Sequence, residues 1–117
     1  MTDDTIFDRI IRREIPADIV YEDEQLIAFR DIAPQAPVHV LFVPKVPVAT
    51  LNDLRPDQAA VVGRLAIAAA DYARREGFAT DGYRLVMNCN DHGGQTVFQL
   101  HLHLLGGAPL GRFGTPK

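Results

Sequence analysis

Gln99-Leu100-His101-Leu102-His103-Leu104 carries the strongest structural signal in this sequence of 117 residues. Polar side chains alternate with leucines, and a period of two residues predicts a β-strand, which we place at residues 97–105. The leucines then share the face that packs on the core, whereas the glutamine and both histidines share the other face. Because a strand rises ~3.3 Å per residue, we expect the two imidazoles to lie about 7 Å apart along that face.

The loop in front of this strand, residues 89–96, contains Gly93-Gly94-Gln95-Thr96 and follows a predicted strand at residues 83–88. Adjacent glycines accept positive φ angles, so their N–H groups can point into one concavity, a nest that suits an anion. A Gly-Gly pair alone is also typical of a plain turn between two strands. Directly before two strand histidines, it indicates a phosphate held next to a nucleophile, with Asn88 as a further donor.

The rest of the chain places this strand in an antiparallel sheet. Pro44 and Pro47 end one strand, and apolar residues at helical spacing between Pro56 and Gly77 predict one long helix. Since neighbouring strands are joined too briefly for parallel crossovers, we predict an α+β domain, an antiparallel meander sheet with one long and one short helix. The other predicted elements are a short helix at residues 5–14, with Thr5 and Asp8 as a capping box, and strands at residues 19–22, 25–31 and 38–43.

The composition is that of one globular domain, with 47% hydrophobic and 23% charged residues. A net charge of −3 without any basic run argues against a nucleic-acid partner. The longest uncharged apolar stretch, residues 65–70, is far shorter than the ~18 residues of a membrane span. An acidic start and a single cysteine, Cys89, favour neither export nor an oxidising compartment, so we expect a cytoplasmic protein with no membrane partner.

Two kinds of chemistry fit the histidine pair. A His-x-His spacing on a strand presents two ligands to zinc, with His39, His92 or Cys89 as a candidate third ligand. Alternatively, one imidazole is a nucleophile and the other assists it in a covalent group transfer. No carboxylate or cysteine pair lies near the strand in the sequence, so we rank the nucleophile above the metal site.

Several motifs follow one another along nearly the whole chain: Asp4-Thr5-Ile6-Phe7, Ile15-Pro16-Ala17, Ala28-Phe29-Arg30-Asp31-Ile32, Pro34-Gln35-Ala36-Pro37-Val38-His39, Gly93-Gly94-Gln95-Thr96-Val97 and His101-Leu102-His103-Leu104-Leu105-Gly106-Gly107. In this order they resemble the histidine triad (HIT) superfamily, most closely its Hint branch of nucleotide-binding phosphoramidases. The resemblance implies a HIT-like fold as a single HIT domain, residues 1–117, with a motif core at residues 5–107 and an irregular tail at residues 108–117. It also implies a homodimer that binds a purine nucleoside monophosphate, AMP or GMP, and needs no metal or other cofactor.

The resemblance assigns roles to individual residues. His101 matches the nucleophile, which attacks the α-phosphorus of an adenylated or guanylated substrate, and His103 matches a phosphate contact. Asp31 resembles the acid that takes the ribose hydroxyls. The remaining assignments are His39 as support of the histidine cluster, Phe29 and Ile32 as walls of the base pocket, Asn88, Gly94, Gln95 and Val97 as nucleotide contacts, and Thr96 as a contact of the phosphate and leaving group in the catalytic set.

The sequence departs from the family pattern at Gln99, where most members have the first histidine of the triad. In the family a main-chain carbonyl at this position holds the second nitrogen of the nucleophile, and a glutamine also supplies that carbonyl. We therefore expect the chemistry to survive. Ala108 replaces a frequent arginine, and the tail lacks a tryptophan of the closest relatives, so the preference for a leaving group stays open.

These observations predict a hydrolase that cleaves purine nucleoside 5'-phosphoramidates, or acyl and aminoacyl adenylates, through a covalent nucleotidyl-histidine intermediate. Neutral imidazole is an available nucleophile near pH 7, and its phosphoramidate is labile enough to be hydrolysed. The alternatives are a dinucleoside polyphosphate hydrolase and a nucleotide- or zinc-binding regulatory module with little turnover.

Overall fold

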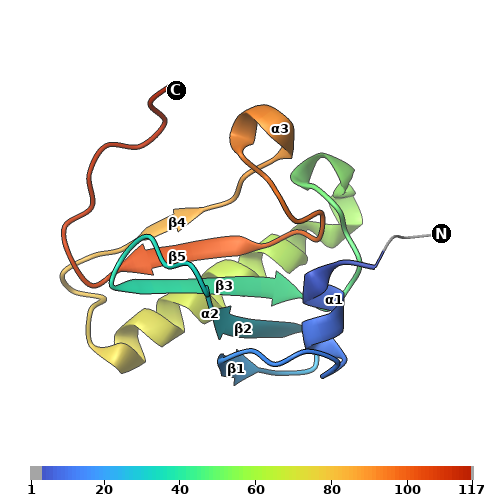
Figure 1. The fold of residues 1–117 in the computed structure, drawn as a ribbon, viewed down its shortest axis with the longest axis horizontal. Helices are drawn as coiled ribbons and strands as arrows, with labels where there is room; N and C mark the ends of the chain where they lie inside the picture. Colours follow the sequence, from blue (N-terminus) through green and yellow to red (C-terminus); the bar gives the residue numbers. More distant parts are fainter. Residues whose placement is uncertain (1–3, 117) are drawn as a thin grey trace.

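Five β-strands and three α-helices make up residues 4–116, the part of the chain that the computed structural model describes (Figure 1). Residues 1–3 and 117, the extreme ends of the predicted domain, lie outside the described residues. In chain order the elements are α1 (Ile6–Ile11), β1 (Ile19–Glu22), β2 (Leu26–Arg30), β3 (Val38–Pro44), the 3-10 turns η1 (Leu51–Asp53) and η2 (Pro56–Gln58), α2 (Ala59–Glu76), β4 (Arg84–Val86), α3 (Asn90–Gly93) and β5 (Leu102–Gly106).

The strands form one antiparallel sheet in the order β1-β2-β3-β5-β4, so the predicted α+β class is confirmed. The meander holds from β1 to β3. It does not continue to β4, because β5 inserts between β3 and β4. The connection from β3 to β4 contains α2, so it is not a short connection and is long enough to cross over a strand.

Each face of the sheet packs against a different helix. On one face, which α2 covers (Figure 1), Leu65 packs with Phe42 of β3 and with Leu102 and Leu104 of β5. On the other face, Phe7 and Ile10 of α1 pack with residues of β2 and β3. Because strand side chains alternate, Leu41 belongs to the α1 face and the histidine two residues before it points to the same face.

The boundaries of several elements differ from the predicted ones for local reasons. α1 ends at Ile11, because Arg13 takes a φ of 63° that a right-handed helix does not allow. α2 ends where it was expected, at Gly77 in the left-handed conformation with φ 87°. The predicted strand at residues 97–105 pairs only from Leu102, because the facing chain leaves the sheet beyond Pro44, and proline offers no N–H to a ladder.

The predicted loop at residues 89–96 contains a third helix, α3, where one short helix besides the long one was expected. Gly94 closes α3 with a φ of 85°. Within the described residues no helix is both long and apolar enough to span a membrane.

Candidate active site

Three imidazoles meet on the α1 face of the sheet. His39 comes from β3, His103 from β5, and His101 from the residue directly before β5. The Nε2 atom of His39 lies 2.9 Å from Nδ1 of His103, and the rings of His101 and His103 have centroids 5.0 Å apart. The structure therefore brings together the histidine pair and the supporting histidine that the sequence singled out, and His92 lies apart from them, exposed on α3.

His101 has a defined tautomer. Its Nδ1 lies 2.8 Å from the main-chain carbonyl oxygen of Gln99, which can only accept a hydrogen bond, so Nδ1 carries the proton. Nε2 then keeps its lone pair, which is the state that a nucleophile needs. The main-chain contact expected from the family is thus present although a glutamine occupies the position.

The other two histidines are linked in one chain of hydrogen bonds. The backbone N–H of Gln35 donates to Nδ1 of His39 at 3.1 Å, so the proton of His39 sits on Nε2. That Nε2–H donates to Nδ1 of His103, which places the proton of His103 on its own Nε2. The cluster therefore offers one free lone pair, on His101, and one N–H donor, on His103.

Burial favours the neutral form of all three imidazoles. Desolvation is the main cause that lowers the pKa of His39 and of His101, while the charge of Asp31 opposes it. The pKa of His103 falls to about 4, first through desolvation and then through the two neighbouring histidines. A nucleophile with a lowered pKa stays unprotonated at pH values where an exposed imidazole is protonated.

We expect activity to persist below pH 6.5 for this reason. The profile of kcat/KM against pH reports the ionisation of the free enzyme, so its acid limb should have its midpoint below the ordinary imidazole value of about 6.5. Since the charge of Asp31 raises the pKa of His101, an Asp31→Asn variant should move the acid limb to still lower pH while lowering kcat/KM. A midpoint at or above 6.5 in the wild type would contradict the buried neutral nucleophile, and a titration of the free substrate controls for its own phosphate ionisation.

Asp31 lies at the edge of the histidine cluster. Its Oδ2 is 3.5 Å from Nε2 of His39, and its Oδ1 accepts the backbone N–H of Ala33 at 2.8 Å. One carboxylate oxygen of Asp31 and one ring nitrogen each of His39 and His103 lie within 4.8 Å of one another, an arrangement that has the composition of a metal site. His39 and His103 were already among the zinc ligands considered from the sequence. Asp31 was not, because it is far along the chain from the strand that carries the histidine pair.

The two residues assigned to the base pocket lie in opposite environments. Phe29 is only 4% exposed and packs edge-on against Phe7, with ring centroids 5.4 Å apart. Ile32 is 96% exposed on the loop after β2. Ile32 is therefore open to contact a ligand, while Phe29 lies within the apolar layer.

The residues before β5 are arranged differently from the predicted nest. The N–H groups of Gly94 and Gln95 donate to Asp91 and Asn90 and close α3, so these two amides do not form an anion nest. The Gln95 side chain is buried, and it donates to the carbonyls of Ala49 and Val97 and accepts from the N–H of Asn90. Of the other assigned residues, Thr96 is exposed and Asn88 lies against Gly93. Val97 is partly buried against the apolar residues between α1 and the sheet.

Phe7 is a site neighbour that the sequence reasoning did not single out. Its ring meets the imidazole of His101 edge-to-face, with centroids 5.0 Å apart and planes at 87°. Phe7 is 6% exposed and contributes to the burial of His101. The sequence does contain a signal, since Ile6, Phe7, Ile10 and Ile11 recur at helical spacing in the first predicted helix. Such a stripe predicts that Phe7 is buried, but it does not identify the residue that its ring contacts.

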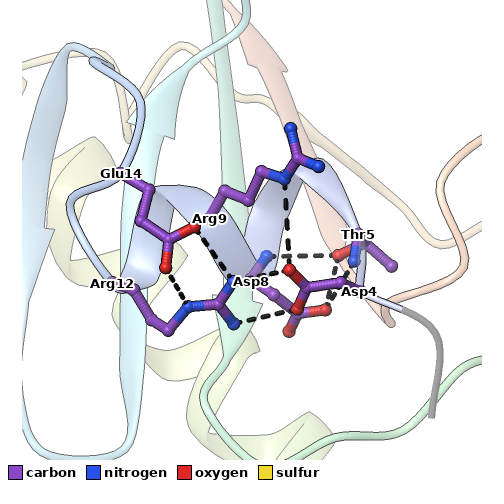
Figure 2. A network of polar contacts seen from close by, with 6 residues as sticks. All are labelled: Asp4, Thr5, Asp8, Arg9, Arg12 and Glu14. Carbon is purple, nitrogen blue, oxygen red and sulfur yellow. Dashed lines mark hydrogen bonds and ion pairs between the residues drawn. The ribbon is translucent and has the colours of Figure 1, made fainter.

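Polar contacts among residues 4–14 stabilise α1 and the chain at its two ends (Figure 2). Thr5 and Asp8 form the predicted capping box, with the Asp8 N–H donating to the Thr5 hydroxyl at 3.1 Å. The guanidinium of Arg12 donates to the carboxylates of Asp4 and Glu14, and this contact lowers the pKa of both acids. These exposed ion pairs contribute little stability individually, and the buried Phe7 does more to dock the helix.

The fold and the histidine cluster together define a histidine triad protein. The chain belongs to the HIT family, since residues 12–110 match the model of the HIT domain. The purine nucleoside phosphoramidase of Escherichia coli (strain K12) is 55% identical over 111 residues, which are 95% of this chain and 93% of that protein. Among solved structures, a HIT family hydrolase from Legionella pneumophila Philadelphia 1 is 47% identical with a TM-score of 0.88, covering 91% of this chain and 95% of that chain. A histidine triad protein from Clostridium difficile is 37% identical with a TM-score of 0.92, covering 97% and 98%.

The chain is thus an enzyme, a hydrolase of the HIT family, and both the family and the HIT-like fold predicted from the motifs are confirmed.

Proposed function

We propose that this chain is a purine nucleoside phosphoramidase that works through a covalent nucleotidyl-histidine intermediate. The observation that carries the proposal is the contact of His101 Nδ1 with the carbonyl of Gln99, because it leaves a lone pair on Nε2 of a neutral imidazole. The 55% identical phosphoramidase of E. coli supports the substrate class.

In the first step Nε2 of His101 attacks the α-phosphorus of the substrate, the P–N bond breaks, and the amine leaves with a proton taken up from solvent. The proton on Nδ1 of His101 stays hydrogen-bonded to the Gln99 carbonyl, which stabilises the positive charge on the phosphorylated ring. Water then attacks the phosphorus and releases a proton to solvent, the P–N bond to His101 breaks, the electron pair returns to Nε2 of the neutral imidazole, and AMP or GMP is released. The Nε2–H of His103 serves as a donor to the phosphoryl oxygens in both steps. Acyl and aminoacyl adenylates fit the same two steps, with a carboxylate as the leaving group.

The nucleotide is held by residues around the cluster. Asp31 accepts the ribose hydroxyls, Ile32 covers the base above the layer of Phe29, and Thr96 donates to the phosphate or leaving group. The further contacts in this proposal are Asn88, Gly94 and the backbone of Val97. Because the amide of Gln95 is occupied by the backbone of Asn90 in its own loop and of the distant Ala49, Gln95 acts by holding the loop against the chain at Ala49.

The assembly that we propose is a cytoplasmic homodimer. The resemblance to the Hint branch is its main support. An open sheet edge at β4, with Leu85 36% exposed, and the exposed Ile67 on α2 are surfaces that a second copy would cover. Sedimentation equilibrium measures this assembly directly.

A comparison of substrates tests the proposed function. We expect hydrolysis of adenosine 5'-phosphoramidate with a kcat/KM at least about 100-fold above that for diadenosine tetraphosphate. A leaving group that the site does not hold in the reactive geometry lowers the rate by about this factor. Activity should be unchanged by a chelator. Preference for diadenosine tetraphosphate would favour the polyphosphate hydrolase instead.

A metal-binding regulatory module is the second candidate, because Asp31, His39 and His103 have the composition of a metal site. Loss of turnover on chelation, restored by zinc, would favour catalytic metal. Zinc binding by a protein that turns over neither substrate would favour the regulatory module.

A further inference from the structure

Gln99 is a buried polar side chain that the proposed reaction does not use directly. It is 2% exposed, and its amide makes three hydrogen bonds to one segment of the backbone. Nε2 donates to the carbonyl of Pro44 at 3.0 Å and to that of Val46 at 2.9 Å, while Oε1 accepts the N–H of Val48 at 3.3 Å. Both donors and the acceptor of the amide are therefore satisfied.

The backbone needs these bonds because of the prolines at the end of β3. In the register of β3 with β5, where Phe42 faces Leu102, a continued ladder would run past Pro44. Pro44 and Pro47 have no N–H to donate, so the ladder stops there and the carbonyls of Pro44 and Val46 need another donor. The Gln99 amide takes the place of a peptide group in the interrupted ladder, and the next bond, from the Leu100 N–H to the Val48 carbonyl at 2.7 Å, continues it.

The same residue holds the imidazole of His101 through its own main chain. The side chain of Gln99 is tied at three points, which restricts rotation of its backbone, and its carbonyl accepts the Nδ1 proton of His101 at 2.8 Å. We infer that Gln99 is a positioning residue: its amide braces the segment at residues 44–48 and thereby aims the carbonyl that sets the tautomer of His101. This inference rests on the proposed role of His101 as the nucleophile.

Counting donors and acceptors explains why a glutamine suits this place. The segment offers two acceptors and one donor, which is the complement of an amide. A neutral imidazole at position 99 has one donor and one acceptor, and an imidazolium has two donors and no acceptor, so a histidine leaves one backbone group unpaired in either state. A methionine at this position has no donor and only a weakly accepting sulfur, so it replaces none of the three hydrogen bonds. The amide also does not titrate, so the brace is independent of pH.

The test compares Gln99→Met and Gln99→His with the wild type. Imidazole ¹⁵N chemical shifts report the tautomer of His101 without any substrate, and kcat and KM for adenosine 5'-phosphoramidate report its effect on turnover. For Gln99→Met we expect a mixture of the two His101 tautomers and a kcat about 10- to 100-fold lower, with KM changed less than about threefold. For Gln99→His we expect a smaller change of the His101 tautomer and a kcat between that of Gln99→Met and that of the wild type, because an imidazole satisfies only part of the segment.

Gln25→Met is the matched control, because Gln25 is exposed and lies outside the histidine cluster, and it should match the wild type in every readout. A folded Gln99→Met protein with the wild-type tautomer and kcat would overturn the inference. If Gln99→Met does not fold, Gln99→His decides: a His101 tautomer and a kcat identical to those of the wild type would equally overturn it. Failure of the proposed function is distinguishable, because a chain without phosphoramidase activity would still show the tautomer change.

Discussion

Replacing His101 by alanine is expected to lower kcat for adenosine 5'-phosphoramidate by roughly 10⁴- to 10⁶-fold, the scale seen when a covalent nucleophile is removed. The covalent route depends on the unprotonated Nε2 of His101. Among the three imidazoles of the cluster, this is the one ring nitrogen whose lone pair is not used in a hydrogen bond between the described residues. Because His39 and His103 remain, AMP should still bind, with a Kd within about tenfold of the wild-type value. Single-turnover kinetics and AMP titration measure the two quantities separately.

Two variants control for this experiment. His92→Ala removes an exposed imidazole on α3 and should leave kcat unchanged, which excludes a general loss of histidine chemistry. His101→Asn keeps a polar side chain beside the Gln99 carbonyl and should be as inactive as His101→Ala, since it restores packing without a nucleophile. A His101→Ala protein with more than about a tenth of wild-type turnover would rule out the covalent mechanism.

Replacing Phe42 by alanine is expected to produce the largest loss of stability. Phe42 is 0% exposed, lies in the middle of β3, and packs edge-on against Tyr72 of α2 with ring centroids 6.3 Å apart. Truncating a buried phenylalanine costs about 3–5 kcal/mol in lost transfer free energy and cavity formation. For a domain of this size, that corresponds to a fall in Tm of roughly 10–20 °C.

Phe113→Ala is the matched control for Phe42→Ala. Phe113 is 78% exposed in the tail, where its ring lies 4.9 Å from the guanidinium carbon of Arg84. Losing this contact should cost no more than about 1 kcal/mol. Urea unfolding at one fixed protein concentration measures both variants, and equal losses would show that Phe42 is not a determinant of the core.

Local signals in the sequence predicted much of the fold. The alternation at residues 99–104, the glycine at the end of α2 and the Thr5–Asp8 capping box all appear in the structure, because each depends on residues close together in the chain. The position of β5 inside the sheet and the early end of its pairing were not predicted. Both depend on the course of distant chain, through the crossover of α2 and the prolines at the end of β3.

The candidate site shows the same division. The histidine row and its family resemblance predicted which side chains gather, and His39, His101 and His103 do lie together. The predicted glycine nest was wrong for the amides of Gly94 and Gln95, because the α3 helix uses them for its own C-terminus. The roles of individual residues toward a nucleotide stay predictions.

The sequence alone determined the leucine face of the last strand, the family and which histidines gather. The first follows from a spacing of two residues, and the other two follow from an ordered set of motifs. The protonation of those histidines follows only from the folded chain. A tautomer depends on whether a ring nitrogen meets a carbonyl or an N–H, and the Gln35 N–H and the Gln99 carbonyl reach their imidazoles through turns and packing that no spacing shows. Burial completes the effect, because desolvation by α1 and the sheet favours the neutral form of the imidazoles.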